Sequence, residues 1–497
     1  MTVARRQIIQ VLLTAAAAAA LLAAAAAPAG ARSLRTGVFD GEIYYANEPA
    51  AYGKTKRTGA DFAKILMRWF QVAPGGTGPS SLPGGLLGND PTDPNNPAYD
   101  WGTYDRFVRG AVRRGLQPVI SIHGTPGWAK ANQGCNANVS CAPVPARLGQ
   151  FAQAAASRYD GSHGQPRVRF WQVWSEPNLD FFMVPPSPDH YRKMVESFTA
   201  GVRAGNPQAR VIAGGLAPLA RKGATVGPLK FMRKLLTTRV HFDIWSTHPY
   251  TTGGPTHHAP GPDDVSIGDL PQMRKQLRVA DRKGRIASRY KRVPFWVTEF
   301  SWDTKPPDPG GVPLRRHARW VAEALYRMSS AGVSTVIWFG LRDQQRGRSY
   351  AETYQSGLYR RAKTVKRDRA KPALRAFRFP FVALPAGGRK VRVWGRTPSG
   401  KRGKVVLQAK FRHGGWRKAG RLRAKGSGIF TKVLRGRRPA KMRAVSGKQK
   451  SVPFGVHRTR DVYQPPFGGN PRATRSGSSR LLPGGGQLYR ALTEVAR

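Results

Sequence analysis

The segment "RFWQVWSEPNLDFF", residues 169–182, carries a carboxylate from a hydrophobic stretch into a turn. From Phe170 to Trp174, aromatic residues and valine surround a single glutamine, a composition typical of a buried β-strand. The proline that follows Glu176 cannot donate a ladder hydrogen bond, so we expect the strand to end before it. Glu176 is therefore predicted at the end of a buried strand, where its side chain can enter a pocket.

Seven further apolar segments alternate with amphipathic helices between residues 36 and 339. In residues 103–115, for example, apolar side chains fall on one helical face and the pattern stops at Gly115, a typical C-terminal cap. The eight predicted strands are "TGVFD", "ILMRWFQV", "QPVISIHG", "VRFWQVWS", "ARVIAGGL", "FDIWSTHPY", "VPFWVTEF" and "STVIWFGL". Alternating strands and helices predict a parallel sheet, and eight strands close a (β/α)8, or TIM, barrel.

In such a barrel, the residues that follow the C-terminal ends of the strands line one mouth. The predicted strand ends carry two carboxylates, a guanidinium, two imidazoles, a phenol, an indole and a hydroxyl. These belong to Arg68, His123, Ser175, Glu176, His248, Tyr250, Glu299 and Trp338. The sequence therefore predicts one candidate site that these eight side chains share.

Glu176 and Glu299 are the only glutamates at these predicted strand ends. Hydrolysis of a glycosidic bond needs an acid and a nucleophile or base, and two carboxyl groups supply both when their pKa values differ. We expect Arg68 and Tyr250 to hold Glu299 ionised, and the negative charge of Glu299 to raise the pKa of Glu176. This predicts Glu176 as the acid/base and Glu299 as the nucleophile.

The barrel, residues 36–339, resembles the clan A retaining glycoside hydrolases, most of all family 5, with family 39 close behind. "VWSEPN" at Glu176 is similar to the Asn-Glu-Pro motif that ends the fourth strand in those enzymes, and "WVTEFSW" matches their seventh-strand glutamate at Glu299. Family 5 enzymes also have an arginine, a histidine, a His-x-Tyr pair and a tryptophan where this chain has Arg68, His123, His248 with Tyr250, and Trp338. The resemblance implies retaining hydrolysis of a β-linked glycan without metal or organic cofactor, and we expect a monomer.

Ser175 departs from the family pattern, in which an asparagine contacts the 2-hydroxyl of the sugar next to the nucleophile. Hydrogen bonds to that hydroxyl strengthen in the transition state, and serine is shorter and lacks the amide. Ser175 therefore predicts either a lower rate or a substrate that differs at its 2-position. It also favours the second hypothesis, a non-catalytic carbohydrate-binding or cell-wall adhesion protein on a barrel that has lost its chemistry.

Some of these residues have simpler structural interpretations. Three of them are also explained as core or ion-pair residues, namely His123, Trp338 and Arg68. The functional interpretation makes Trp338 the floor on which a sugar ring stacks. His248, with His257 and His258, suggests a metal site, but the latter two lie in a Gly- and Pro-containing stretch without regular ligand spacing. No metal ligand is therefore predicted.

The N-terminal residues 1–31 contain two arginines, then an alanine-rich apolar run, then small residues at Ala29 and Ala31. This order is typical of a secretory signal peptide cut after Ala31, and it predicts a secreted or envelope-associated protein. An uncleaved membrane anchor is the alternative, and Arg5-Arg6 is also compatible with twin-arginine export. No later segment is apolar enough to span a bilayer.

Cys135 and Cys141 are the only cysteines, and they lie close together in a polar, turn-rich stretch. In an exported protein this spacing favours a local disulfide. A two-cysteine metal site is the alternative, but no second pair of ligands accompanies it.

The charge of the chain is concentrated in its C-terminal part. The 497 residues contain 83 lysines and arginines against 27 acidic residues, a formal net charge of +56, and from Arg360 onward 38 basic residues face three acidic ones. Alternating apolar and basic residues around glycine turns predict a small antiparallel β-sandwich. The predicted domains are a signal at 1–31, the barrel at 32–383, the basic sandwich at 384–456 and a disordered tail at 457–497.

Dense basic charge on alternating strand positions is often only a solvated face. The functional alternative is adhesion to an anionic cell-wall polymer through long-range attraction and counterion release. Nucleic acid also binds such surfaces, but the chain has no nucleic-acid-binding motif and is predicted to be exported. We therefore expect a β-linked glycan as substrate, an anionic polymer as a second partner and no specific nucleic acid.

Overall fold

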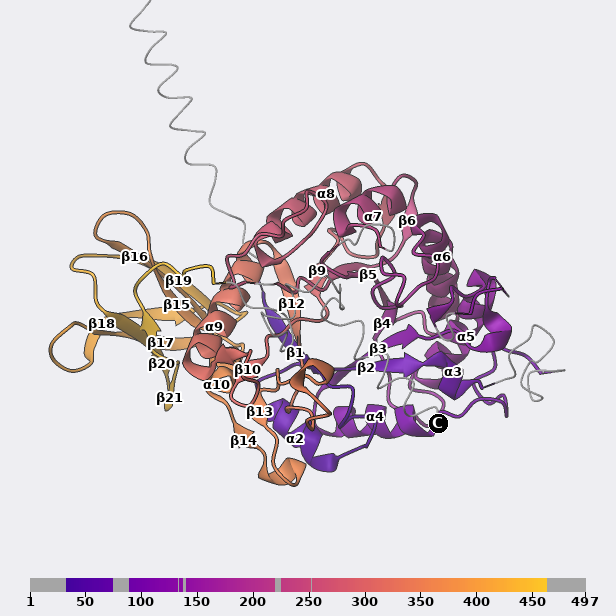
Figure 1. Cartoon of the computed structure of the whole chain (residues 1–497), viewed down its shortest axis with the longest axis horizontal. Coiled ribbons are helices and arrows are strands. Elements are labelled where there is room, and N and C mark those ends of the chain that lie inside the picture. The colour runs from indigo at the N-terminus through magenta and orange to yellow at the C-terminus, as the bar shows by residue number, and fades with distance from the viewer. Residues whose placement is uncertain are drawn as a thin grey trace, which may run out of the picture.

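In the computed structural model, a closed barrel of eight parallel strands forms the centre of the molecule, with helices around it (Figure 1). The structure describes residues 33–74, 89–132, 134–136, 140–219, 225–251 and 253–462. The strand order around the barrel is β1-β12-β9-β7-β5-β4-β3-β2, so the chain winds around it once. The predicted barrel is confirmed.

Each of the eight predicted segments supplies one barrel strand. The strands are β1 (Arg35–Phe39), β2 (Phe62–Arg68), β3 (Gln117–His123), β4 (Phe170–Val173), β5 (Arg210–Leu216), β7 (Ile244–Thr247), β9 (Phe295–Val297) and β12 (Val333–Phe339). The boundaries of the second strand differ most from the prediction: it begins three residues earlier than the pattern suggested, and Trp69–Val72 forms a helical turn, α3. Trp69 is fully buried and stacks on Phe151, so the tertiary contact accounts for this aromatic residue without a strand.

The outer layer consists of helices that bury one face each. They are α2 (Pro49–Arg57), α4 (Gly102–Arg113), α5 (Pro145–Arg158), α6 (Pro188–Gly205), α7 (Pro228–Leu235), α8 (Leu270–Arg282), α9 (Leu314–Ser330) and α10 (Pro372–Arg378). Outside the barrel and the C-terminal sheets, the described residues also form three short two-stranded sheets: β6 (Val240–His241) with β8 (Ile286–Ala287), β10 (Thr304–Lys305) with β11 (Val312–Pro313), and β13 (Tyr359–Arg360) with β14 (Arg369–Ala370). After α4, Gly115 adopts the left-handed conformation that the pattern predicted (φ 65°).

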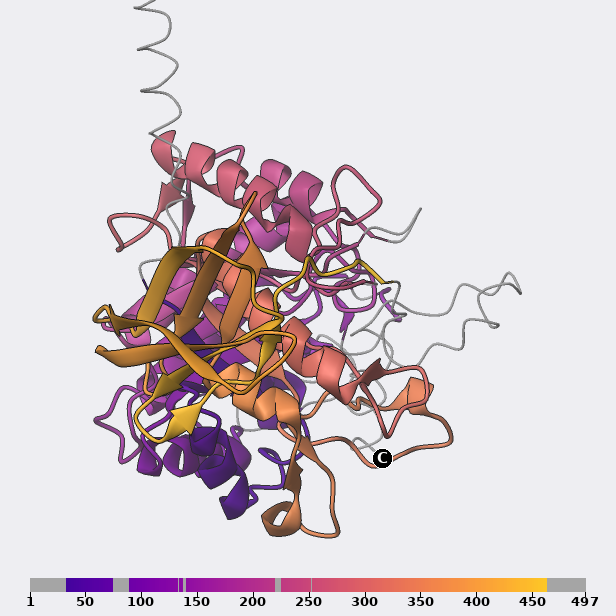
Figure 2. The same cartoon turned by 90° about the vertical axis from the view of Figure 1, so that its left-hand side faces the viewer.

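The C-terminal β-sandwich packs on one side of the barrel. One sheet, β15 (Phe381–Pro385), β16 (Lys390–Arg396) and β19 (Ile429–Arg435), faces α9, where Tyr326 meets Trp394 with ring centroids 5.6 Å apart. The other sheet contains β17 (Gly403–Lys410), β18 (Arg417–Ala424), β20 (Lys441–Ser446), β21 (Gln449–Lys450) and β22 (Phe454–Gly455). Figure 2 shows the sandwich turned toward the viewer in front of the barrel.

The segment 457–462, predicted to belong to a disordered tail, instead crosses back onto the barrel. Arg319 of α9 donates to the carbonyl oxygens of Gly455 (2.8 Å) and His457 (2.9 Å), and Asp461 accepts from the backbone N–H of Gly254 at 2.9 Å. Composition pointed to disorder because it could not show these tertiary partners. The remainder of the predicted tail, 463–497, and the predicted signal, 1–31, lie outside the described residues.

Two further expectations concern the chain as a whole. Cys135 and Cys141 form the predicted disulfide. Within the part of the chain that the structure describes, none of the helices combines the length and the apolar character needed to cross a membrane.

Candidate active site at the barrel mouth

Glu176 reaches the mouth because the backbone turns sharply after β4. Trp174 and Glu176 both have positive φ (63° and 49°), a left-handed conformation that costs free energy in residues other than glycine. The Glu176 N–H donates to the carbonyl oxygen of Gly215 at the end of β5 (3.0 Å). Asn178 continues the connection by accepting from the N–H of Ala217 at 2.9 Å. These bonds between neighbouring strand ends hold the strained turn and fix the direction of the Glu176 side chain.

Glu299 follows β9, the seventh strand of the barrel, as the sequence pattern predicted. The hydroxyl of Tyr250 donates to Glu299 Oε1 at 2.9 Å. Both glutamates are buried, with 2% of Glu176 and 4% of Glu299 exposed. Tyr250 therefore has the role that the sequence assigned to it, that of a hydrogen-bond donor to the carboxylate of Glu299.

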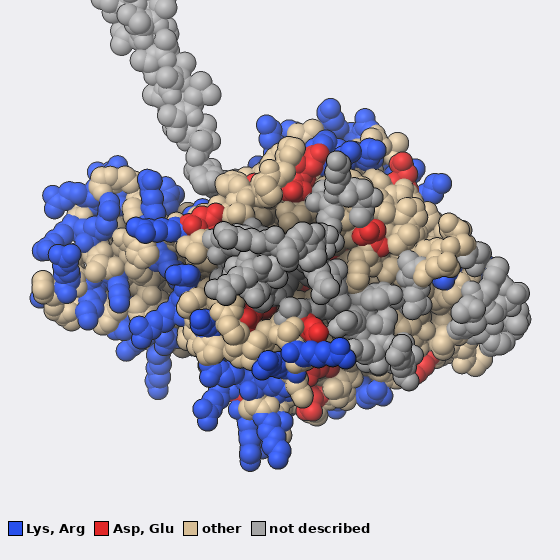
Figure 3. All heavy atoms as spheres, in the orientation of Figure 1, with Lys and Arg blue, Asp and Glu red and all other residues tan. Residues whose placement is uncertain are grey.

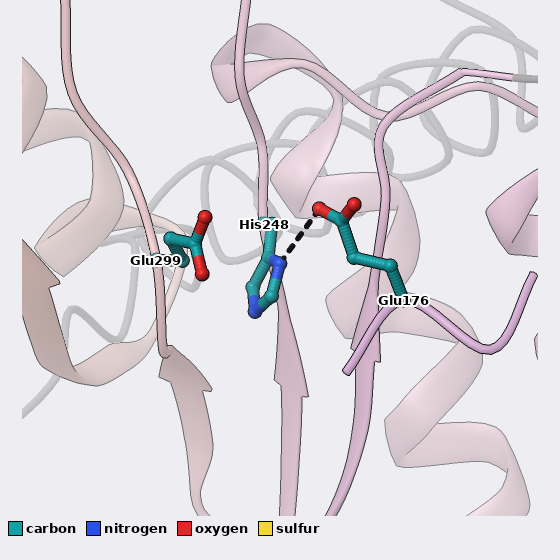
Figure 4. A group of neighbouring side chains, drawn as sticks. All are labelled: Glu176, His248 and Glu299. Atoms are coloured by element: carbon teal, nitrogen blue, oxygen red, sulfur yellow. Dashed lines mark hydrogen bonds and ion pairs between the residues drawn. The ribbon is translucent and has the colours of Figure 1, made fainter. Parts of the chain in front are cut away.

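His248 lies between the two glutamates (Figure 4). Its Nδ1 is 2.9 Å from Glu176 Oε1, and its Nε2 is 3.1 Å from Thr298 Oγ1. One oxygen of each carboxylate and one ring nitrogen of His248 all lie within 4.8 Å of one another. The structure thus brings Glu176, His248 and Glu299 into one compact cluster from three strand ends.

Lys64, on β2, supplies a positive charge close to the cluster of Glu176, His248 and Glu299. Its side chain is fully buried, and Nζ donates to the carbonyl oxygen of Thr298, the residue before Glu299, at 3.2 Å. Burial lowers the pKa of Lys64 to about 8, against the opposing influence of Glu299 and Glu176. Lys64 therefore supports the peptide that leads into Glu299 and places a positive charge near both carboxylates.

The environments of the two glutamates drive their pKa values apart. Burial raises the pKa of Glu176 well above its ordinary value, the negative charge of Glu299 raises it further, and Lys64 opposes both. Burial also raises the pKa of Glu299, but Lys64 and the hydrogen bond from Tyr250 lower it. The pair titrates as one coupled system, in which Glu299 loses its proton first.

The imidazole of His248 is neutral and links Glu176 to Thr298. Burial lowers its pKa well below the ordinary value, and the nearby Lys64 lowers it further. With Nδ1 protonated, His248 donates to Glu176 Oε1 and accepts from Thr298 Oγ1. Glu176 Oε2 is buried and has no hydrogen-bond partner among the described residues, so it is the oxygen available to carry the acidic proton.

Arg68 does not have the role that the sequence suggested. Its guanidinium lies over the ring of Tyr45, 4.1 Å from the centroid, and Nη1 approaches Gln71 Oε1 at 3.5 Å. The charge that lowers the pKa of Glu299 comes from Lys64 instead. Arg68 still ends β2 beside His123, its register partner on β3, and so remains at the mouth.

Trp338 is the second correction, because it is a core residue and not an open stacking surface. Only 1% of it is exposed, and its indole packs edge-on against His317 of α9 and Phe377 of α10. The indole N–H donates to the carbonyl oxygen of Ser356 at 2.9 Å. Trp338 therefore faces the helical layer, and the simpler interpretation of this residue is the correct one.

The other two predicted residues lie at the turn that carries Glu176: His123 packs against it, and Ser175 is part of it. His123 is buried against Trp174, with ring centroids 4.6 Å apart, and burial lowers its pKa to about 3, so the ring is neutral. Ser175 is 1% exposed and stands between the two left-handed residues of the turn. The loss of a direct contact from this position to the sugar 2-hydroxyl stays a prediction.

Sequence analysis missed Lys64 because the predicted second strand began one residue after it. The sequence did contain a signal for Lys64, because a lysine in the middle of an otherwise apolar strand is unusual. Lys64 is also four residues before Arg68, so both side chains lie on the same face of the strand. The cluster of Glu176, His248 and Glu299 is also compact enough to offer three ligand atoms to a cation. That this site works without a metal ion stays a prediction.

Comparison with known proteins gives a distant but consistent result. No protein-family model matches the chain. A beta-xylosidase of Caldicellulosiruptor saccharolyticus is 24% identical over 226 residues, 43% of this chain and 42% of that protein. A beta-xylosidase of Geobacillus stearothermophilus is 24% identical over 224 residues, 43% of each chain. The match therefore spans less than half the length of these curated relatives.

Solved structures extend the similarity to most of the chain. A monomeric beta-xylosidase from Caulobacter crescentus CB15 aligns with a TM-score of 0.50 at 16% identity, over 82% of this chain and 95% of that one. A GH39 enzyme from Xanthomonas axonopodis pv. citri gives a TM-score of 0.48 at 16% identity, over 84% and 94%. The resemblance to the clan A glycoside hydrolases is confirmed.

Proposed function

We propose that this protein is a retaining glycoside hydrolase that cleaves β-linked glycans by double displacement. The observation that carries the proposal is the approach of one oxygen of Glu176 to one oxygen of Glu299 within 4.8 Å. Retaining enzymes hold their two carboxyl groups about 5 to 5.5 Å apart, whereas inverting enzymes separate them by about 6.5 to 9.5 Å to admit a water molecule. The separation here lies below the inverting range and so supports retention.

In the first step, the Glu299 carboxylate attacks the anomeric carbon while Glu176 transfers its proton to the leaving oxygen. The glycosidic bond breaks, a bond forms between sugar and Glu299, and Glu176 becomes a carboxylate. In the second step, Glu176 removes a proton from water, which attacks the anomeric carbon and releases Glu299. The higher pKa of Glu176 and the lower pKa of Glu299 support this division.

The substrate that we propose first is a β-xyloside, because the two curated relatives are beta-xylosidases. Ser175 leaves the 2-hydroxyl without the usual amide contact, so discrimination at the 2-position is expected to be weak.

The test measures product stereochemistry. Purified protein is incubated with 4-nitrophenyl β-D-xyloside, β-D-glucoside and β-D-mannoside, and proton NMR follows the first anomer released. We expect the β-anomer to appear first and the xyloside to be turned over fastest. Appearance of the α-anomer first would contradict retention, and absence of turnover on these glycosides and on β-glucans, xylans and mannans would favour the carbohydrate-binding hypothesis.

We also propose that the protein works outside the cytoplasm. The disulfide between Cys135 and Cys141 supports this, since such bonds persist in oxidising compartments, and so does the signal pattern at residues 1–31. N-terminal sequencing of the native protein is expected to begin at Arg32. An intact N-terminus in the membrane fraction would indicate the anchor instead.

A further inference from the structure

One face of the β-sandwich carries an array of cations with no acidic residue in its own domain. On the sheet β18-β17-β20-β21, alternate residues point away from the core, as the burial pattern of β17 shows. The outward positions hold eight basic side chains, which we call the basic face: Lys404, Lys410, Lys418, Arg421, Arg423, Lys441, Arg443 and Lys450. The chain contains no aspartate or glutamate between residues 369 and 460.

The strand register places like charges directly opposite one another. Lys404 pairs with Arg423 across β17 and β18, and Lys410 pairs with Lys441 across β17 and β20. Directly opposed like charges destabilise a sheet, and folding alone gives no reason to accumulate them. The array spans four strands, about 14 Å across, and about 20 Å along β17, given usual strand spacings.

The basic face is also the side of the sandwich that the barrel leaves open. The other sheet, β15-β16-β19, contacts α9 through Trp394. The strand β18 lies at the far side from the barrel (Figure 1), and Figure 3 shows lysine and arginine crowded over this domain, whereas the barrel surface is mixed. A partner can therefore approach the face without blocking the mouth.

We propose that the basic face binds an acidic polysaccharide and so holds the barrel near its glycan substrate. An extended polyanion matches this face better than one small anion, because the cations are spread over several strands and do not converge on a pocket. Trp416 lies at the same face, where the guanidinium of Arg443 is 4.2 Å from its ring centroid. A carboxylate-bearing glycan fits better than nucleic acid, because single-stranded binding requires several exposed aromatic residues for base stacking.

The experiment compares two variants with equal changes in charge. The face variant combines Lys404→Gln, Lys410→Gln, Arg421→Gln and Arg423→Gln. The control variant replaces four exposed basic residues at α8 and its C-terminal end, Lys275→Gln, Arg278→Gln, Arg282→Gln and Lys283→Gln. Binding to immobilised polygalacturonate is measured in full-length protein, with neutral xylan and double-stranded DNA as comparison ligands.

We expect the face variant to bind polygalacturonate at least about tenfold more weakly than wild type at 0.1 M salt, and the control variant to stay within about twofold. Wild-type binding should disappear toward roughly 0.5 M salt, where the Debye length is about 4 Å. Equal losses in both variants would show that net charge and not this face is responsible. Tighter binding of DNA than of polygalacturonate would assign the face to nucleic acid and overturn the proposal.

The binding assay is independent of the proposed hydrolysis. Polygalacturonate is not the proposed substrate, and a Glu299→Gln variant is expected to bind it as wild type does. Circular dichroism of the face variant checks that the sandwich remains folded. Loss of binding in Glu299→Gln would move the binding site to the barrel mouth and contradict the assignment to the basic face.

Discussion

The barrel mouth and the β-sandwich hold their charges in opposite ways. At the mouth, Glu176, Glu299 and Lys64 are buried and close to one another, so each alters the pKa of the others. On the basic face, the charges are exposed to solvent and the domain supplies no acidic partner. Buried charges interact strongly over a few ångströms, whereas exposed charges act through a field that salt screens. The same residue types therefore set protonation in one region and, in our proposal, attract a polyanion in the other.

Removing a buried carboxylate should have the largest effect. We expect Glu299→Ala to lose at least about a thousandfold in kcat on an aryl β-xyloside, because the nucleophile is gone. Glu176→Ala should lose about 10²- to 10⁴-fold on substrates with poor leaving groups and far less on dinitrophenyl glycosides, which need no protonation. Azide should restore glycosyl transfer in Glu299→Ala. Rates within about threefold of wild type in both variants would contradict the assignment.

Replacing Lys64 tests whether the buried cation acts through its charge. A positive charge lowers the pKa of both glutamates, so Lys64→Met should raise both and move the whole pH-rate profile to higher pH. Below pH 7 we expect kcat/KM to fall by roughly three- to tenfold. The difference should shrink above pH 8, because the pKa of Lys64 is about 8 and the wild-type cation is then lost.

Lys64→Gln serves as the matched control, since it keeps a donor for the Thr298 carbonyl without the charge. If charge is responsible, Lys64→Gln and Lys64→Met shift the pH profile alike. If only the hydrogen bond matters, Lys64→Gln behaves as wild type. A reduced rate with an unshifted pH profile in both variants would mean that Lys64 is merely structural.

The junction of the two regions offers a third test, because there a basic side chain is used structurally. Arg319 bonds to the chain at Gly455 and His457 and lies over the ring of Phe454, 3.8 Å from its centroid. We expect Arg319→Met to lower the free energy of unfolding by about 2 to 4 kcal/mol, measured in urea. Arg316→Met, at an exposed neighbouring site, should change it by less than about 0.5 kcal/mol. Equal effects would show that the junction adds no stability.

The smallest expected effect is that of metal removal. If a bound cation and not Lys64 neutralised the cluster of Glu176, His248 and Glu299, chelation would lower the rate. We expect dialysis against EDTA to change kcat/KM on an aryl β-xyloside by less than about twofold. A loss that added divalent metal reverses would show that the barrel depends on metal for its charge balance.

Prediction from sequence succeeded for residues that directly follow a barrel strand, because the strand end fixes where they lie. Glu176 and Glu299 follow apolar strands, so the barrel rule placed both at one mouth. It failed for Trp338 because alternate residues of a strand face opposite sides, and the apolar pattern of this strand did not show which side Trp338 faces. It failed for Arg68 because an arginine side chain reaches several partners, and only the packing around Tyr45 selected one.

The sequence by itself determined the eight strands, the two glutamates at their ends, the disulfide and the uneven distribution of charge, because each depends on local pattern or composition. Tertiary structure alone decided that Lys64 binds the Thr298 carbonyl oxygen next to Glu299, that His248 joins Glu176 to Thr298, and that the segment after Gly455 returns to α9. Each of these contacts joins segments more than 40 residues apart. Closure of the barrel fixes such distances, and no periodicity in the chain records them.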